Sequence, residues 1–255
     1  MKSDRHQISI VHAVGEVTVG DYDCFAGHLA TSEDPRAAVT ADQLLDDDMR
    51  AVIEGRFARK FDRFDPRAVH SIWMKWYLNA FLPPVLLADL FLMRAPAILL
   101  DHVSFILGED ARIVAVKLAG QGEDTSSADP FGRFESLIFD HFEPLIDIWA
   151  ARTDVTRRVY WSNVGNTFEA MLRRVELASG LSPRLEGAQR LLSEPVWRDG
   201  RSNPIFDAVH YVSEADRPER RRRVCCLQYL LPDRRFCKAC PIEEARFSSI
   251  GGAAC

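Results

Sequence analysis

The sequence of 255 residues has no apolar run long enough to cross a membrane. A spanning helix needs about 20 predominantly apolar residues, and the most hydrophobic stretch, residues 80–100, is interrupted by three prolines, Asp89 and Arg94. The first 12 residues are mixed and charged, without the apolar core and cleavage site of a secretory signal. We therefore expect a cytoplasmic protein without stable membrane insertion, and loose association with the inner membrane is left open.

The sequence also lacks an excess of positive charge and a glycine-rich nucleotide motif. Its formal net charge is −5, which gives no electrostatic footprint for nucleic acid. No Gly-x-Gly-x-x-Gly follows a strand-like segment, so no nicotinamide-binding or flavin-binding domain is evident. Nucleic acid is not an expected partner, and any redox chemistry would need electrons from another protein.

Apolar residues are abundant enough for a folded core. Hydrophobic residues make up 47% and charged residues 27% of the chain, as in ordinary soluble proteins. Several segments repeat apolar residues at helical spacing, and short runs have the composition of strands. The pattern predicts an α+β protein: a helix-rich domain with a small antiparallel sheet over residues 1–217, then a short C-terminal module over residues 218–255.

Local signals predict the individual elements. Asp65-Pro66 is a typical helix start, since a capping side chain is followed by proline in the first turn. Helices are expected over about 40–57, 65–80, 134–149 with a kink at Pro144, 155–178, 185–192 and 204–211. Strands are expected within residues 8–19 and 224–230, a hairpin over 103–107 and 113–116, and a loop over 120–129.

Four of the six cysteines lie within sixteen positions: Cys225, Cys226, Cys237 and Cys240. In a reducing compartment such a group is more typical of a metal site than of disulfides. Two residues between Cys237 and Cys240 let both sulfurs face one centre, whereas the adjacent pair departs from the spacing of zinc ribbons. A two-iron cluster tolerates that departure better. The spacing favours an iron–sulfur cluster, with structural zinc and a disulfide or catalytic thiol pair as alternatives; Cys24 and Cys255 lie outside the group.

A charged run precedes these cysteines, and it marks the expected module boundary. Eight of the ten residues from Glu214 to Arg223 are charged. Such a run is usually a solvated face. Alternatively, Arg222 and Arg223 would raise the reduction potential of an anionic cluster, or the run would dock an acidic electron carrier. The sequence leaves these interpretations open.

The cysteine segment resembles the FhuF-type ferric siderophore reductases. The resemblance lies in Arg222-Arg223-Val224-Cys225-Cys226-Leu227-Gln228-Tyr229-Leu230-Leu231-Pro232 and Cys237-Lys238-Ala239-Cys240-Pro241, with a weaker match at Trp161-Ser162-Asn163-Val164-Gly165-Asn166. It implies a cytoplasmic protein with a [2Fe–2S] cluster on all four cysteines. It also implies one-electron reduction of Fe(III) in an imported ferric siderophore, which we expect to be of the hydroxamate type.

Such a reaction needs a substrate site and an electron source. Hard oxygen donors hold Fe(III) more strongly than Fe(II), so one electron releases the metal without an acid–base pair. The expected partners are the ferric siderophore and an external donor such as a ferredoxin or a flavoprotein reductase. Two alternatives remain: an iron–sulfur protein that serves a partner enzyme, and a zinc-stabilised binding module without redox activity.

A chelate-binding cavity should offer aromatic walls and a few polar groups. The candidates are Trp73, Trp76, Trp161, Asn163 and Arg223. Aromatic residues at helical spacing are more often core, and Asn163 could equally serve a structural role. Tyr229 is expected on the same strand face as Cys225, where it would pack over the cluster.

Overall fold

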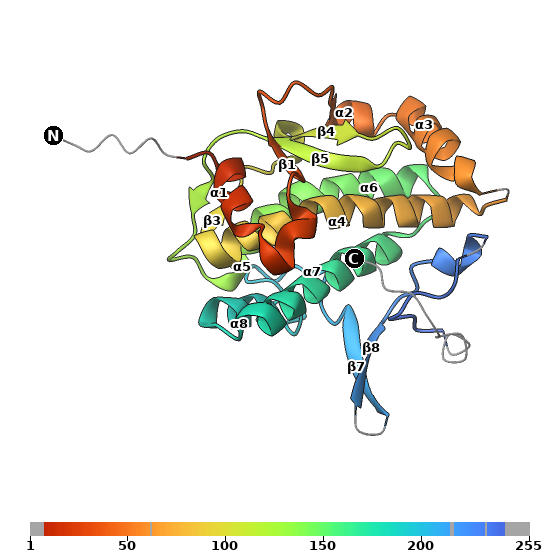
Figure 1. Cartoon of the computed structure of the whole chain (residues 1–255). Coiled ribbons are helices and arrows are strands. Elements are labelled where there is room, and N and C mark those ends of the chain that lie inside the picture. The colour runs from red at the N-terminus through yellow and green to blue at the C-terminus, as the bar shows by residue number, and fades with distance from the viewer. Residues whose placement is uncertain (1–7, 62, 215–216, 233, 243–255) are drawn as a thin grey trace.

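The structure is a computed structural model that describes residues 8–61, 63–214, 217–232 and 234–242. The long helices α4 (Pro66–Leu92) and α7 (Arg157–Ser179) pack against each other, and α4 also contacts the main sheet (Figure 1). The C-terminal segment lies near the N-terminal ends of both helices. The predicted α+β class, helix-rich with a small sheet, is confirmed.

Helix α4 begins where the sequence predicts. The Asp65 side chain accepts a hydrogen bond from the Arg67 backbone, and Pro66 occupies the first turn, where its missing N–H costs nothing. The helix continues through the buried Pro83 and Pro84 to Met93, which ends it in the left-handed conformation. Because most of its circumference is apolar and buried, α4 is a core helix and fixes the position of everything packed on it.

The main sheet has the order β1-β5-β4-β2. The predicted hairpin is confirmed as β4 (Ser104–Leu107) and β5 (Ile113–Leu118), which pair antiparallel. Strand β1 (Leu29–Thr31) adds parallel to β5, and β2 (Val39–Thr40) adds antiparallel to β4. A second antiparallel pair joins β3 (Arg94–Ala95) to β6 (Glu123–Asp124), so the loop expected over 120–129 contains one short strand.

The prediction of strands within residues 8–19 is wrong. These residues form helix α1 (Ile10–Val17), whose first turn is capped by the Ser9 side chain. Ile10, Ala13 and Val14 are buried, and their spacing puts them on one helical face. The contact of α1 with α4 buries that face. Tertiary packing therefore decides between two periodicities that short apolar runs allow.

The remaining helices lie where they are predicted, but they begin and end at different residues. A second capping residue, Asp46, divides the segment expected over 40–57. A π-helical segment precedes Pro144, which occupies the first turn of the next helix instead of kinking one. The elements are η1 (Gly20–Phe25), α2 (Ala41–Leu44), α3 (Asp47–Phe57), η2 (Ala58–Lys60), η3 (Leu100–His102), α5 (Pro130–Glu135), η4 (Ser136–Phe142), α6 (Glu143–Arg152) and α8 (Pro183–Arg190).

Two predictions fail near the C-terminus. The helix expected over 204–211 is a turn followed by β7 (Val209–Glu214), which pairs antiparallel with β8 (Arg217–Arg222). The strand expected over 224–230 is irregular chain, because Leu227 is left-handed and η5 (Gln228–Leu230) follows it. The β7–β8 hairpin spans the boundary predicted at residue 217, which stays a prediction. Cys255 lies outside the described residues.

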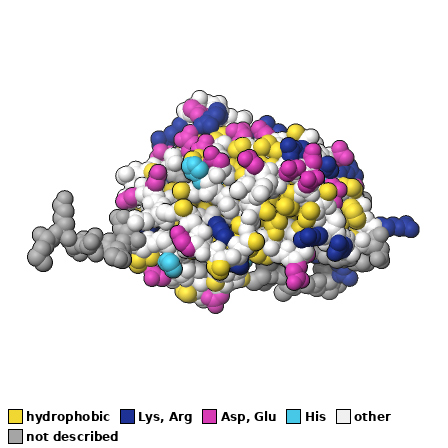
Figure 2. All heavy atoms as spheres, turned by 90° about the horizontal axis from the view of Figure 1, so that it is seen from above, with side chains coloured by type: hydrophobic (Ala, Val, Ile, Leu, Met, Phe, Trp, Pro, Cys, Tyr) yellow, Lys and Arg dark blue, Asp and Glu magenta, His cyan; other side chains and the backbone are white. Residues whose placement is uncertain are grey.

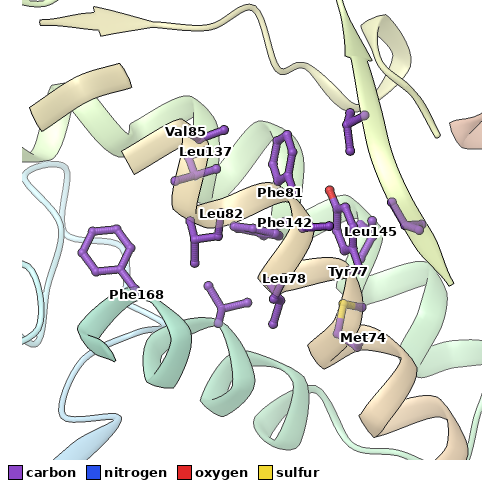
Figure 3. Close-up of a cluster of buried hydrophobic side chains, with 14 of the residues drawn as sticks. Met74, Tyr77, Leu78, Phe81, Leu82, Val85, Leu137, Phe142, Leu145 and Phe168 are labelled. Atoms are coloured by element: carbon purple, nitrogen blue, oxygen red, sulfur yellow. The ribbon is translucent and has the colours of Figure 1, made fainter. Parts of the chain in front are cut away.

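The core lies between α4, α7 and the segment formed by η4 and α6 (Figure 3). Tyr77 and Phe81 stack with a centroid distance of 5.5 Å, and Phe142 meets both rings edge-on. His141 is fully buried among them, where its Nδ1 is 2.6 Å from the Ile98 carbonyl and its Nε2 bonds the Tyr77 hydroxyl. The apolar core thus contains one satisfied polar pair.

A buried ion cluster joins three helices at the other end of α4. The Asp89 carboxylate, 4% exposed, bonds Arg133 of α5 and Arg184 of α8. Arg184 also donates to the Asp89 carbonyl at 2.6 Å. One carboxylate between two guanidinium groups is costly to break, since removal of a partner leaves buried charge. The cluster holds the α5–α8 side of the molecule to α4.

On the face above the sheet, acidic and basic side chains are interspersed with apolar ones (Figure 2). No helix in the described part of the chain is long and apolar enough to span a membrane.

Burial of His141 makes stability depend on pH. Desolvation lowers the pKa of His141 to about 4, from 6.5. Between these values the unfolded chain binds a proton that the folded chain excludes, so stability falls as pH drops from about 6.5 toward 4. The loss should be roughly 1 kcal/mol per pH unit. In urea titrations at several pH values, His141→Gln should flatten this dependence, whereas His102→Gln, at an exposed site, should not. Equal slopes in all three proteins would refute the assignment.

Gly165 permits close packing between α7 and the turn before β7. An added Cβ would lie 2.4 Å from the Ala208 Cβ and 3.3 Å from the Ile205 carbonyl oxygen. Gly165→Ala should therefore destabilise by roughly 1–2 kcal/mol, because overpacking outweighs the gain in helix propensity. The double variant Gly165→Ala/Ala208→Gly should recover part of the loss in thermal unfolding. Stabilisation by the single variant would contradict this packing.

Candidate functional site

The four cysteines lie where the C-terminal segment meets α4 and α7. After β8 the chain passes Cys225 and Cys226, turns through η5, and returns to Cys237 and Cys240. The backbone N–H of Arg222 donates to the Ala239 carbonyl at 2.9 Å, which brings the two cysteine pairs beside each other. Cys226 and Cys240 are buried, whereas Cys225 and Cys237 are partly exposed.

Serine and asparagine side chains attach this segment to the two helices. Ser71 of α4 donates to the Cys226 carbonyl at 2.9 Å, and Ser162 of α7 donates to the Val224 carbonyl at 3.3 Å. The Asn163 amide nitrogen donates to the Ser71 hydroxyl at 3.1 Å. The cysteine backbone is therefore held by hydrogen bonds that also link α4 to α7.

Successive side chains of a strand point to opposite faces, so the consecutive arginines of β8 point to two different sides. Arg220 pairs with Glu169 of α7, and Arg222 also points toward α7. Arg221 points the other way and donates to the Cys240 carbonyl at 3.2 Å. The run is therefore not a uniformly solvated face, since Arg221 and Arg222 are buried.

Arg222 is a buried cation that pairs with no carboxylate among the described residues. It is 1% exposed, and its Nη2 donates to the Asn163 Oδ1 at 2.5 Å and the Ser162 hydroxyl at 3.2 Å. Its Nε and Nη1 have no hydrogen-bond partner in the structure as described, and no ion pair with a described carboxylate forms. A buried charge is costly unless it is paired. The guanidinium therefore favours an anion at this place.

Lys75 brings a second positive charge to the cysteines. Its Nζ lies 3.8 Å from the Cys226 sulfur and 3.2 Å from the Gln228 side-chain oxygen. A hydrogen bond from Cys237, with the charges of Lys75 and Arg222, lowers the pKa of Cys226 to about 4. The same hydrogen bond and burial raise the pKa of Cys237. The environment thus stabilises a thiolate.

Cys225 has a different environment. Burial raises its pKa to about 11, although its sulfur accepts a hydrogen bond from the Leu227 backbone at 3.3 Å. No group of three or more His, Cys, Asp or Glu side chains in the described ranges is placed to hold a metal ion. The four cysteines nevertheless share one region of the fold.

A hollow of about 390 Å³ opens beside the first cysteine pair. Trp161 and Ser162 of α7 form one side, and Arg223 and Val224 form another. Arg223 is about half exposed and its Nε lies 2.9 Å from Asp207. The hollow therefore combines an aromatic wall with a cation that solutes can reach.

The other predicted substrate residues lie elsewhere. Trp73 is buried, stacks on Trp149 at 5.0 Å, and donates from its indole to the Ala111 carbonyl at 2.8 Å. Trp76 is 38% exposed beneath the Arg112 guanidinium. Both tryptophans contact the connection between β4 and β5. Asn163 is buried. Trp161 and Arg223 share the hollow; the substrate-binding role of all five stays a prediction.

Sequence reasoning missed Ser71 and Lys75. They stand one helical turn apart in α4, but no local signal relates this helix to cysteines about 150 positions later. Ser162 could have been noticed, since it lies in the Trp-Ser-Asn segment. The expected strand face shared by Tyr229 and Cys225 is wrong, because the chain turns at Leu227. Tyr229 stacks on Phe236, and its packing over a cluster stays a prediction.

Comparisons with known proteins identify relatives of this chain. A curated protein from Escherichia coli (strain K12), named ferric siderophore reductase, is 24% identical over 174 residues, which are 68% of this chain and 65% of that protein. Among solved structures, ATP-bound aerobactin synthetase IucA from Klebsiella pneumoniae is similar over 64% of this chain and 34% of that chain, with a TM-score of 0.46 and 12% identity.

The sequence profile described as "Ferric iron reductase FhuF-like transporter" matches residues 71–219. This range is more than half of the chain and contains Ser71, Ser162 and Asn163, but it ends before Cys225. The resemblance seen in the sequence is thereby confirmed: the chain belongs to the FhuF-like ferric iron reductase family.

Proposed function

We propose that this protein reduces Fe(III) held by an imported siderophore, one electron at a time, through a [2Fe–2S] cluster on Cys225, Cys226, Cys237 and Cys240. The observation that carries the proposal is that four cysteines share one region of an FhuF-like protein, where the cations Lys75 and Arg222 lie near Cys226. A ferric siderophore reductase among the relatives supports the substrate class.

The donor set fits such a cluster in chemistry and in charge. Four thiolates are the usual ligands of a two-iron cluster, whose formal charges sum to about −2. The orphaned N–H groups of Arg222 and the ammonium of Lys75 would offset that charge. When bound, the cluster would accept and donate single electrons at a potential set by this environment.

The hollow beside Val224 suits a bulky chelate. Trp161 would pack against its apolar parts, and Arg223 would meet its oxygen atoms. A hydroxamate siderophore offers both surfaces. The hollow is not enclosed, so the Fe(II) chelate could leave. Because hard oxygen donors hold Fe(II) weakly, capture of Fe(II) elsewhere would draw the reaction forward.

The direct test uses the full chain purified without oxygen and reduced chemically. A ferric hydroxamate is then added with a chelator specific for Fe(II). The protein should be reoxidised, and its visible absorption should return within seconds to minutes. Fe(II) should appear at about one per electron stored. Reoxidation without Fe(II), or a colourless protein, would refute the proposed reaction.

Cys237→Ser should abolish or strongly alter the visible and electron paramagnetic resonance spectra, because it removes one of four ligands. Cys24→Ser, outside the group, should leave both spectra unchanged. Circular dichroism should show folded protein in both cases. An unaltered spectrum in folded Cys237→Ser would remove this cysteine from the ligand set.

Arg222→Gln should lower the reduction potential by roughly tens of millivolts, because a nearby cation favours the more negative reduced state. Arg222→Lys should restore part of the shift. The matched control is Arg220→Gln, two positions earlier on the same strand, where the guanidinium already pairs with Glu169. Potentiometric titration with optical detection measures all three. A potential unchanged in Arg222→Gln would exclude the arginine from tuning the site.

A further inference from the structure

A stacked aromatic pair, one ring exposed and the other half-buried, lies on the loop between the two cysteine pairs. The rings of Tyr229 and Phe236 stack with a centroid distance of 5.5 Å and an interplanar angle of 25°. Tyr229 is 41% exposed, and Phe236 is the residue before Cys237. An exposed tyrosine held by a half-buried ring is a typical anchor of protein interfaces.

Cations surround this pair, and together they form what we call the Tyr229 face: Arg63, Arg67, Tyr229, Arg234, Arg235 and Phe236. The four arginines are exposed. A hollow of about 540 Å³ connects Arg63 and Arg67 to the loop at Leu230, the residue after Tyr229. The Gln228 amide also bonds the Arg235 carbonyl at 3.1 Å.

The positive charge is a property of this part of the chain. Residues 217–242 contain eight lysines and arginines. Arg234 and Arg235 belong to the Tyr229 face, whereas Arg220, Arg221 and Arg223 pair with carboxylates elsewhere. Among the described residues, two acids lie beside the Tyr229 face: Asp65, which pairs with Arg67 at 2.6 Å, and Asp154, which lines the hollow. The face above the sheet has interspersed charges instead (Figure 2).

The Tyr229 face is separate from the hollow that we assign to the chelate. That hollow is lined by Trp161, Asp207 and Arg223, and its lining shares no residue with the one at Arg63 and Leu230. The hollow assigned to the chelate borders the chain just before Cys225, whereas the Tyr229 face lies on the loop between the two cysteine pairs. One molecule could therefore occupy each surface at the same time.

We propose that the Tyr229 face docks a small acidic iron–sulfur carrier protein, which supplies the electrons. This rests on the proposed function. The reduced carrier loses one electron, the cysteine site gains it, and the site later returns it to Fe(III) in the chelate; no proton or bond is transferred. An obligate one-electron carrier with an acidic surface matches both the charge of the face and the single-electron chemistry, and the aromatic pair supplies the desolvated centre of the contact.

Binding tests the face without any electron transfer. An oxidised, acidic plant-type [2Fe–2S] ferredoxin, titrated calorimetrically with the full chain at low ionic strength, should bind, and binding should weaken steeply in about 0.5 M salt. Arg234→Glu/Arg235→Glu should weaken it by roughly tenfold or more. The control Arg190→Glu/Arg198→Glu reverses two exposed arginines near α8 and should not. Tyr229→Ser should weaken binding at every salt concentration.

The rate of reduction by the same ferredoxin in its reduced form, measured by stopped flow, should fall in the variants that bind it weakly. Dithionite should reduce every variant. Each reduced variant should still reduce a ferric hydroxamate at the rate of the unmodified protein. Failure of that last step alone would count against the proposed function and leave the docking result intact. Equal binding by the reversed variant, a preference for an acidic flavin carrier, or salt-sensitive binding of duplex DNA instead of ferredoxin would overturn the docking proposal.

Discussion

A buried guanidinium that no carboxylate of the described residues neutralises is the constraint on which the cysteine site depends. Arg222 gives its Nη2 to Asn163 and Ser162, and its remaining N–H groups find no partner among the described residues. Asn163 in turn holds Ser71, which holds the Cys226 carbonyl. The same network therefore fixes the backbone of the first cysteine pair and leaves positive charge beside the sulfurs, as a bound dianion would require.

The hydrogen bonds also explain why the helical body and the cysteine segment belong together. The family match covers the body and ends before Cys225, yet α4 and α7 contribute Ser71, Lys75 and Ser162 to the site. The body would position both the sulfurs and the chelate, and this accounts for a chain much longer than four ligands need. Electrons and substrate would arrive at different surfaces, so neither partner has to leave before the other binds.

Some of this could be predicted from the sequence, for local reasons. The start of α4 follows from Asp65 and Pro66, and the β4–β5 hairpin follows from two apolar runs around a turn. Residues 8–19 and 204–211 were predicted wrongly, because short apolar stretches fit either periodicity until packing selects one. The cysteines could be recognised by spacing, whereas the contacts of Ser71 and Lys75 depend on helix packing that no local pattern encodes.

The central claim is that these four cysteines hold two irons bridged by sulfide. Iron, zinc and acid-labile sulfide, quantified per chain in protein purified without oxygen, test it most directly. The account predicts about two irons and two sulfides per chain with negligible zinc. One zinc per chain without sulfide, or no metal at all, would contradict it.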